Sequence, residues 1–162
     1  MMRFEHLVKM FDELSPQPAI TRRQLWQGLV LRAEDPCRFD ENISSAQVLA
    51  YDEHGLRREV RFGELLVREH VGFEHEKSVQ YLTEPSEQHP PSKLGMFIEE
   101  PQPGCLFIRF VYENDMPEEV VTNDTNDPAY YVSYLKAAYK QADLHTAKVI
   151  LALAQEGVLG SP

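Results

Sequence analysis

Four residues of types that can do chemistry stand within otherwise apolar, alternating stretches of this chain: His6, Arg58, Glu69 and Tyr112. A histidine beside a carboxylate can act as a general acid or base. A buried arginine and glutamate can either anchor the polar group of a ligand or form an internal salt bridge. His145, near the end of the chain, is a second histidine that can approach His6. A buried histidine is more often a hydrogen-bonded core residue than a catalytic one, so these residues indicate a polar spot in an apolar site and leave catalysis open.

Other signatures of enzymes and metal sites are missing from the sequence. It contains no Gly-x-Ser-x-Gly elbow, no glycine-rich phosphate loop and no Cys-x-x-Cys pair. The acidic and histidine residues of Glu69–Glu76 do not have zinc-site spacing, and the acidic segment 114–127 lacks a calcium-binding loop pattern. We therefore expect no metal and no cofactor. Cys37 and Cys105 are far apart and are predicted to be buried free thiols.

The composition is that of one globular domain spanning residues 1–162. Acidic residues outnumber basic ones and the formal net charge is -10, so nucleic acids and anionic membranes are poor partners. No apolar run approaches the roughly 20 residues of a membrane-spanning helix, and the first residues lack a secretory pattern. We expect a cytoplasmic protein without membrane insertion.

The final third of the chain predicts one long helix, from about Asp127 to Glu156. It contains no proline or glycine after Pro128, which suits the first helical position next to a capping Asp127, and Gly157 suits the left-handed end. Such a helix would be about 40 Å long, so a broad surface must cover it. Its predicted apolar face consists of Tyr131, Leu135, Ala138, Ala142, Val149 and Leu153. Tyr130, Tyr131, Tyr134 and Tyr139 are expected to divide between the core and a partly exposed surface or homodimer contact.

The preceding sequence predicts mostly strands. Side chains of alternating character in Phe4–Phe11 predict a first strand. Thr21 is predicted to cap a helix over Arg22–Glu34, which ends at Asp35-Pro36. A period of two then predicts strands at Ala46–Asp52, Leu56–Phe62, Leu65–Phe73, Ser78–Thr83, Lys93–Glu100 and Cys105–Glu113. The short connections between them favour an antiparallel meander. The order of elements predicts an α+β fold with a seven-stranded sheet and its helices on one side.

This order resembles the helix-grip fold of the START and Bet v 1 superfamily, SRPBCC. Within it, four segments resemble the AtaL-like family, whose name comes from an acetylaranotin gene cluster: Phe4–Val8, Thr21–Pro36, Leu56–Gly63 and Leu106–Glu113. The Leu-Trp-Gly-Leu-Arg-Ala-Glu-Asp-Pro pattern of the second segment carries most of the likeness. The resemblance implies a curved sheet wrapped around the C-terminal helix with an internal ligand cavity between them. It implies no catalytic residue.

In a helix-grip fold alternate residues of each strand face the helix, so strand parity predicts the cavity lining. With a two-residue turn at Gly63-Glu64, Arg58 and Glu69 become cross-strand neighbours on this face. Small residues on the helix leave room beside the sheet. The predicted lining consists of His6, Trp26, Arg58, Val60, Phe62, Val67, Glu69, Tyr81, Met96, Ile98, Ile108, Phe110, Tyr112, Leu135, Ala138 and Ala142.

Three functions are compatible with this interpretation. The leading hypothesis is that the cavity binds a small hydrophobic or aromatic molecule, with Arg58, Glu69, Tyr112 or His6 orienting it. The alternative is an enzyme of the polyketide cyclase or hydratase type that uses His6, Glu69 or Tyr112 as acid or base. A third hypothesis is a protein-interaction module, which would require a contiguous apolar surface patch.

Overall fold

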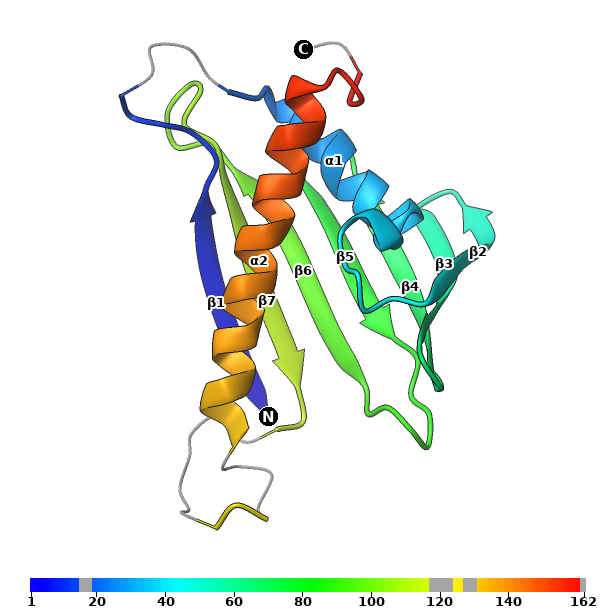
Figure 1. The fold of residues 1–162 in the computed structure, drawn as a ribbon. Coiled ribbons are helices and arrows are strands. Elements are labelled where there is room, and N and C mark those ends of the chain that lie inside the picture. Colours follow the sequence, from blue (N-terminus) through cyan, green and yellow to red (C-terminus); the bar gives the residue numbers. More distant parts are fainter. Residues whose placement is uncertain (15–18, 117–123, 127–130, 161–162) are drawn as a thin grey trace.

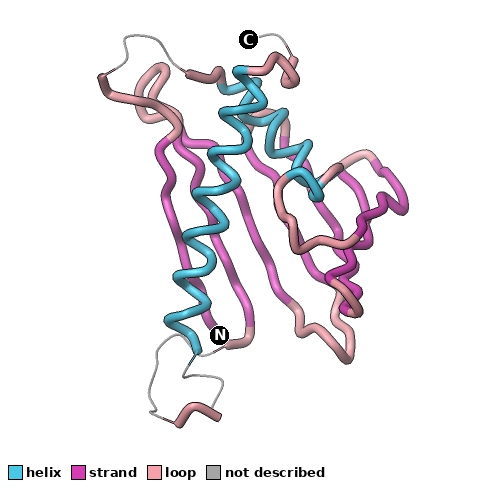
Figure 2. Tube along the Cα trace, in the orientation of Figure 1, coloured by secondary structure: helices cyan, strands magenta, loops and turns pink. Residues whose placement is uncertain are grey.

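The structure is a computed structural model that describes residues 1–14, 19–116, 124–126 and 131–160. One curved sheet of seven antiparallel strands forms a layer in the order β1-β7-β6-β5-β4-β3-β2, and both helices lie on the same face of it (Figures 1 and 2). The elements are β1 (Met2–Lys9), α1 (Arg22–Glu34), the short 3-10 helix η1 (Pro36–Arg38), β2 (Ser45–Asp52), β3 (Gly55–Phe62), β4 (Leu65–Glu74), β5 (Ser78–Thr83), β6 (Ser92–Glu99), β7 (Phe107–Asn114) and α2 (Val132–Gln155). The predicted α+β helix-grip fold is confirmed.

The strands follow the predicted alternation closely. In β7, Ile108, Phe110 and Tyr112 are buried while the residues between them are only half-buried. Strands β2 to β7 pair with their neighbours in sequence, and β1 closes the order by pairing with β7. Gly63 adopts a positive φ of 62° in the turn between β3 and β4, a conformation that a residue without a Cβ adopts at low cost. The expected hairpins are therefore present, with strand ends displaced by one or two residues.

Helix α1 begins and ends where the sequence predicts. The Thr21 hydroxyl accepts a hydrogen bond from the Gln24 amide, and the Gln24 side chain accepts one from the Thr21 amide, each at 3.1 Å. This reciprocal capping box satisfies two amides that the first turn leaves unpaired. Leu25 and Leu29 are fully buried on one side of the helix. The cap and the apolar side together position α1 across one end of the sheet (Figure 1).

Helix α2 is present, but its buried face differs from the predicted one. The buried residues are Val132, Asp143, Thr146, Ala147, Ile150 and Leu153, so only Leu153 of the predicted face is buried. Asp143, Thr146, Ala147 and Ile150 follow helical spacing, but an apolar pattern does not reveal this stripe because two of its residues are polar. The predicted end is correct, because Gly157 has a positive φ of 75°. The predicted cap Asp127 and first position Pro128 lie outside the described residues.

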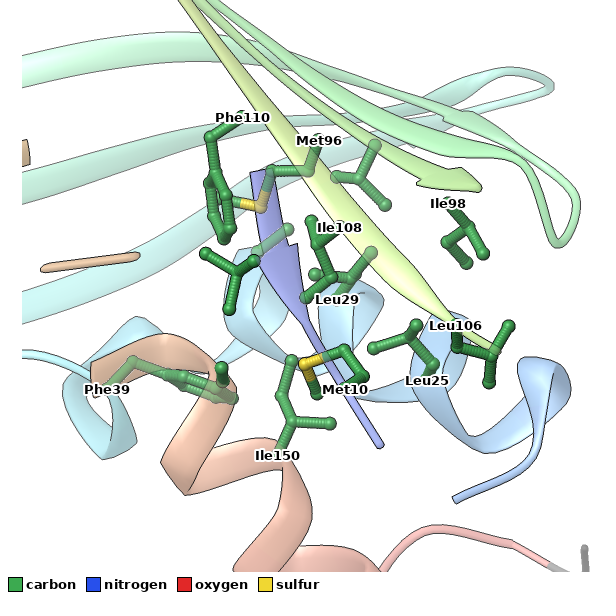
Figure 3. Packing of buried hydrophobic residues seen from close by; sticks show 14 of the residues in the cluster. Met10, Leu25, Leu29, Phe39, Met96, Ile98, Leu106, Ile108, Phe110 and Ile150 are labelled. Carbon is green, nitrogen blue, oxygen red and sulfur yellow. The ribbon is translucent and has the colours of Figure 1, made fainter. Parts of the chain in front are cut away.

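The hydrophobic core occupies the end of the concave face where α1 and the second half of α2 meet the sheet (Figure 3). Met10, Met96 and Phe110 pack there with the helix residues Leu29 and Ile150, all at most 1% exposed. The helices approach so closely that a Cβ added at Gly28 would lie 2.7 Å from Ile150 Cγ2. This end of the concave face is therefore solid. No helix in the described part of the chain is long and apolar enough to cross a membrane.

Candidate functional site

A cavity of about 910 Å³ opens on the concave face beside the packed core. Its walls come from strands β3 to β7, from α2, and from the last turn of α1 with the segment that follows it. Small-molecule sites in proteins occupy roughly 300 to 1,000 Å³, so the space suffices for a drug-sized molecule. The arrangement leaves one end of the concave face packed and the other hollow.

The structure brings half of the predicted lining residues together around this cavity. They are Arg58, Phe62, Val67, Glu69, Tyr81, Tyr112, Ala138 and Ala142. The two alanines belong to the exposed side of α2, where their small side chains leave space between helix and sheet. Strand parity and the small residues of the helix therefore predict these eight lining residues correctly.

The other eight predicted residues do not line the cavity. Met96, Ile98, Ile108 and Phe110 belong to the hydrophobic core, since α1 and the second half of α2 cover their end of the sheet. Val60 is only 1% exposed and lies off the lining, and Leu135 is half-buried on α2. Trp26 packs edge-on against Phe73, with its indole N–H 3.4 Å from the Ser78 carbonyl. His6 belongs to β1 and contacts Asp143 of α2. Strand parity identifies the concave face but not the part of it that the helices fill.

Arg58 and Glu69 form the predicted cross-strand pair on the inner wall. They are register partners in β3 and β4, and Glu69 Oε1 accepts from Arg58 Nη2 at 2.8 Å and from Nε at 3.1 Å. Arg58 Nη1 also donates to the carbonyls of Ala33 at 2.9 Å and Arg32 at 3.3 Å. These carbonyls belong to the last turn of α1, whose partial negative charge favours a cation. The pair therefore joins the sheet to α1 while it faces the cavity.

A second arginine, which the sequence analysis missed, lies beside this pair. Arg32 places its guanidinium 5.3 Å from the centre of the Tyr81 ring, and Arg58 approaches the same ring at 4.9 Å. Arg32 Nε lies 3.4 Å from the Thr146 hydroxyl of α2. No local pattern identifies Arg32, because only the tertiary structure brings the last turn of α1 over the cavity.

Tyr112, Asp143 and His6 form a hydrogen-bonded series at the boundary between cavity and core. The Tyr112 hydroxyl donates to Asp143 Oδ1, and His6 Nδ1 lies 3.1 Å from Asp143 Oδ2. Burial raises the pKa of Asp143 above its ordinary value, although both hydrogen bonds oppose that rise. Burial and the neighbouring carboxylate also raise the pKa of Tyr112. The series can hold a proton close to the cavity.

Asp143 is not among the predicted residues, and the predicted neighbour of His6 differs from the observed one. His6 is predicted to approach His145, but in the structure Asp143 takes the hydrogen bond of His6. His145 lines the cavity, whereas His6 does not. An aspartate within a helix normally indicates a solvent-facing position, although its spacing to Ala147 and Ile150 marks the buried side.

Aromatic rings cover the wall next to this series. The rings of Tyr112 and Tyr139 stack with centroids 3.8 Å apart and an interplanar angle of 8°, and Phe4 lies 6.3 Å from each. Tyr139 also lines the cavity, whereas Tyr131 and Tyr134 are exposed. The predicted division of the tyrosines between packing and surface is confirmed for these three residues. Tyr112 and Tyr139 both line the cavity, so the stack forms an aromatic part of its wall.

The cavity lining contains an exposed thiol. Cys37 in η1 is exposed and lines the cavity, and Cys105 is half-buried. The prediction that both cysteines are buried is wrong, because η1 carries Cys37 along the cavity rather than into the core. Both are free thiols, as predicted.

Comparison with known proteins gives a family and a fold. Residues 10–157 match the family described as acetylaranotin biosynthesis cluster protein L. No curated protein matches the sequence. The structure is similar to the di-domain ARO/CYC StfQ from the steffimycin biosynthetic pathway, with a TM-score of 0.69 and 9% identity over 97% of this chain and 51% of that one. The chain thus spans about half the length of that protein.

Two further similar structures have nearly the same length as this chain. A START superfamily protein from Mycobacterium smegmatis has a TM-score of 0.57 at 12% identity, and Ara h 8.0201 has a TM-score of 0.58 at 12% identity. In both cases the match covers 95% of this chain and 97% of the other. At these identities the likeness concerns the fold, which is that of the START and Bet v 1-like proteins.

Proposed function

We propose that this chain, which belongs to the acetylaranotin biosynthesis cluster protein L family, binds a small hydrophobic or aromatic molecule in the cavity between sheet and α2. The observation that carries the proposal is a cavity of about 910 Å³ next to a solid core. Apolar surface that a ligand removes from water would supply most of the affinity. The stacked Tyr112 and Tyr139 provide an aromatic wall, and Arg58 and Glu69 provide polar groups that orient the ligand.

Anilinonaphthalene, a neutral aromatic dye that fluoresces in apolar surroundings, tests the proposal. We expect saturable binding to the wild-type protein, and we expect Ala142→Trp to weaken it by about tenfold or more, because an indole would occupy part of the cavity. Ala142 is exposed on α2, so the core stays intact. Ala152→Trp is the matched control, since Ala152 is exposed on the same helix but does not line the cavity. Equal binding by both variants, or none by the wild type, would defeat the proposal.

The series Tyr112, Asp143 and His6 favours a second candidate function, an acid- or base-catalysed reaction such as cyclisation or loss of water. Tyr112 lines the cavity, and its hydroxyl donates a hydrogen bond to the buried carboxyl group of Asp143, an arrangement suited to proton transfer. Co-expression with an enzyme that makes a linear aromatic-polyketide precursor provides the test. Tyr112→Phe should keep dye binding yet lose any product that depends on this chain. An unchanged product profile would remove the catalytic candidate and leave the binding function.

A further inference from the structure

Arg32 carries its positive charge at the cavity wall without a carboxylate partner among the residues that the structure describes. Its Nε lies 3.4 Å from Thr146 Oγ1, and its guanidinium also interacts with the Tyr81 side chain, so its polar neighbours are hydroxyl groups and no described carboxylate forms an ion pair with it. The neighbouring Arg58 differs, since its guanidinium donates hydrogen bonds to Glu69 and to two carbonyls of α1. Two guanidinium groups thus lie against the Tyr81 ring and one carboxylate compensates them.

This local excess of positive charge runs against the charge of the whole protein. The formal net charge is -10, and Asp40, Glu41 and Glu113 line the cavity as well. Asp143 is the buried carboxyl group near this wall, but Tyr112 and His6 already occupy its two oxygens. A partly buried charge without a partner is costly, and an anionic group placed opposite it recovers that cost. The terminal nitrogens of Arg32, which form no ion pair among the described residues, make a planar fork that suits the two oxygens of a carboxylate.

We propose that the molecule bound in the cavity carries a carboxylate, which pairs with the terminal nitrogens of Arg32 while its apolar or aromatic body lies against Tyr81 and Tyr112. The inference rests on the proposed function and names the chemical class of its ligand. Arg58, already neutralised by Glu69, then holds α1 and helps to orient the ligand, and Arg32 is the residue that selects ligands by charge. The aromatic rings supply affinity without regard to charge, so the two contributions can be measured separately.

Competition against bound anilinonaphthalene tests this assignment with two molecules of nearly equal shape, the anion naphthoate and its neutral amide. At fixed ionic strength and neutral pH we expect naphthoate to compete roughly tenfold to hundredfold better with the wild type, the range of a charge-assisted hydrogen-bonded pair. Arg32→Met keeps the aliphatic stem and should abolish this preference, whereas Arg32→Lys should keep part of it. Arg38→Met is the control, because Arg38 also lines the cavity but already pairs with Asp35 at 2.8 Å.

The outcomes separate this inference from the proposed function. Loss of the naphthoate preference in an Arg32→Met variant that still binds the dye saturably, with the preference retained in Arg38→Met, supports it. Equal competition by both molecules in the wild type, or a preference that survives in Arg32→Met, overturns it while the cavity remains a binding site. If the dye itself does not bind the wild type, the proposed function fails and this inference fails with it.

Discussion

Removal of Glu69 should destabilise the protein more than removal of any exposed carboxylate on the same strands. The Arg58 and Glu69 side chains are 7% and 15% exposed, so Glu69→Ala leaves a buried guanidinium without its anion. Breaking a buried pair costs about 3 to 5 kcal/mol. The two carbonyls of α1 still accept from Arg58, and Glu69 is partly accessible to water, so we expect a loss of about 2 to 3 kcal/mol. For a chain of this size that lowers Tm by about 5 to 10 °C.

The neighbouring pair on the opposite face is a matched control. Glu59 and Arg68 are register partners in the same two strands, but their side chains are 24% and 48% exposed. Glu59→Ala should therefore cost less than about 1 kcal/mol. Urea unfolding of both variants measures the difference, and Arg58→Met combined with Glu69→Leu should lose less than the sum of the single changes. A Glu69→Ala variant that is as stable as Glu59→Ala would refute the structural role of the pair.

Three further changes test the core and its buried carboxyl group. The raised pKa of Asp143 predicts that unfolding free energy decreases as pH rises from the ordinary value of 3.8 through the folded pKa, and urea unfolding against pH should show no such loss in Asp143→Asn. Phe110→Ala should cost about 3 to 5 kcal/mol in the same assay, because no solvent reaches that side chain. Gly28→Ala should lower Tm through about 1 to 3 kcal/mol of overpacking against Ile150, and a Tm equal to wild type would contradict the close helix contact.

Local patterns in the sequence determined the elements of this fold. Alternating residues predicted the strands, Thr21 and Gln24 specified the start of α1, and Gly157 specified the end of α2. The pairing of Arg58 with Glu69 also followed from the sequence, because a two-residue turn at Gly63 fixes the register of β3 and β4. Each of these depends on residues that are close together in the chain.

Only the tertiary structure decided which part of the concave face is hollow. Strand parity places Phe110 and Tyr112 on the same face, yet only Tyr112 lines the cavity, since α1 and the second half of α2 cover only one end of the sheet. The tertiary structure also decides the roles of Arg32 and Asp143. Their partners come from distant segments, and the spacing within one helix does not reveal which side meets another element. Burial by long-range packing is a property of the assembled layers, so it is absent from any local pattern.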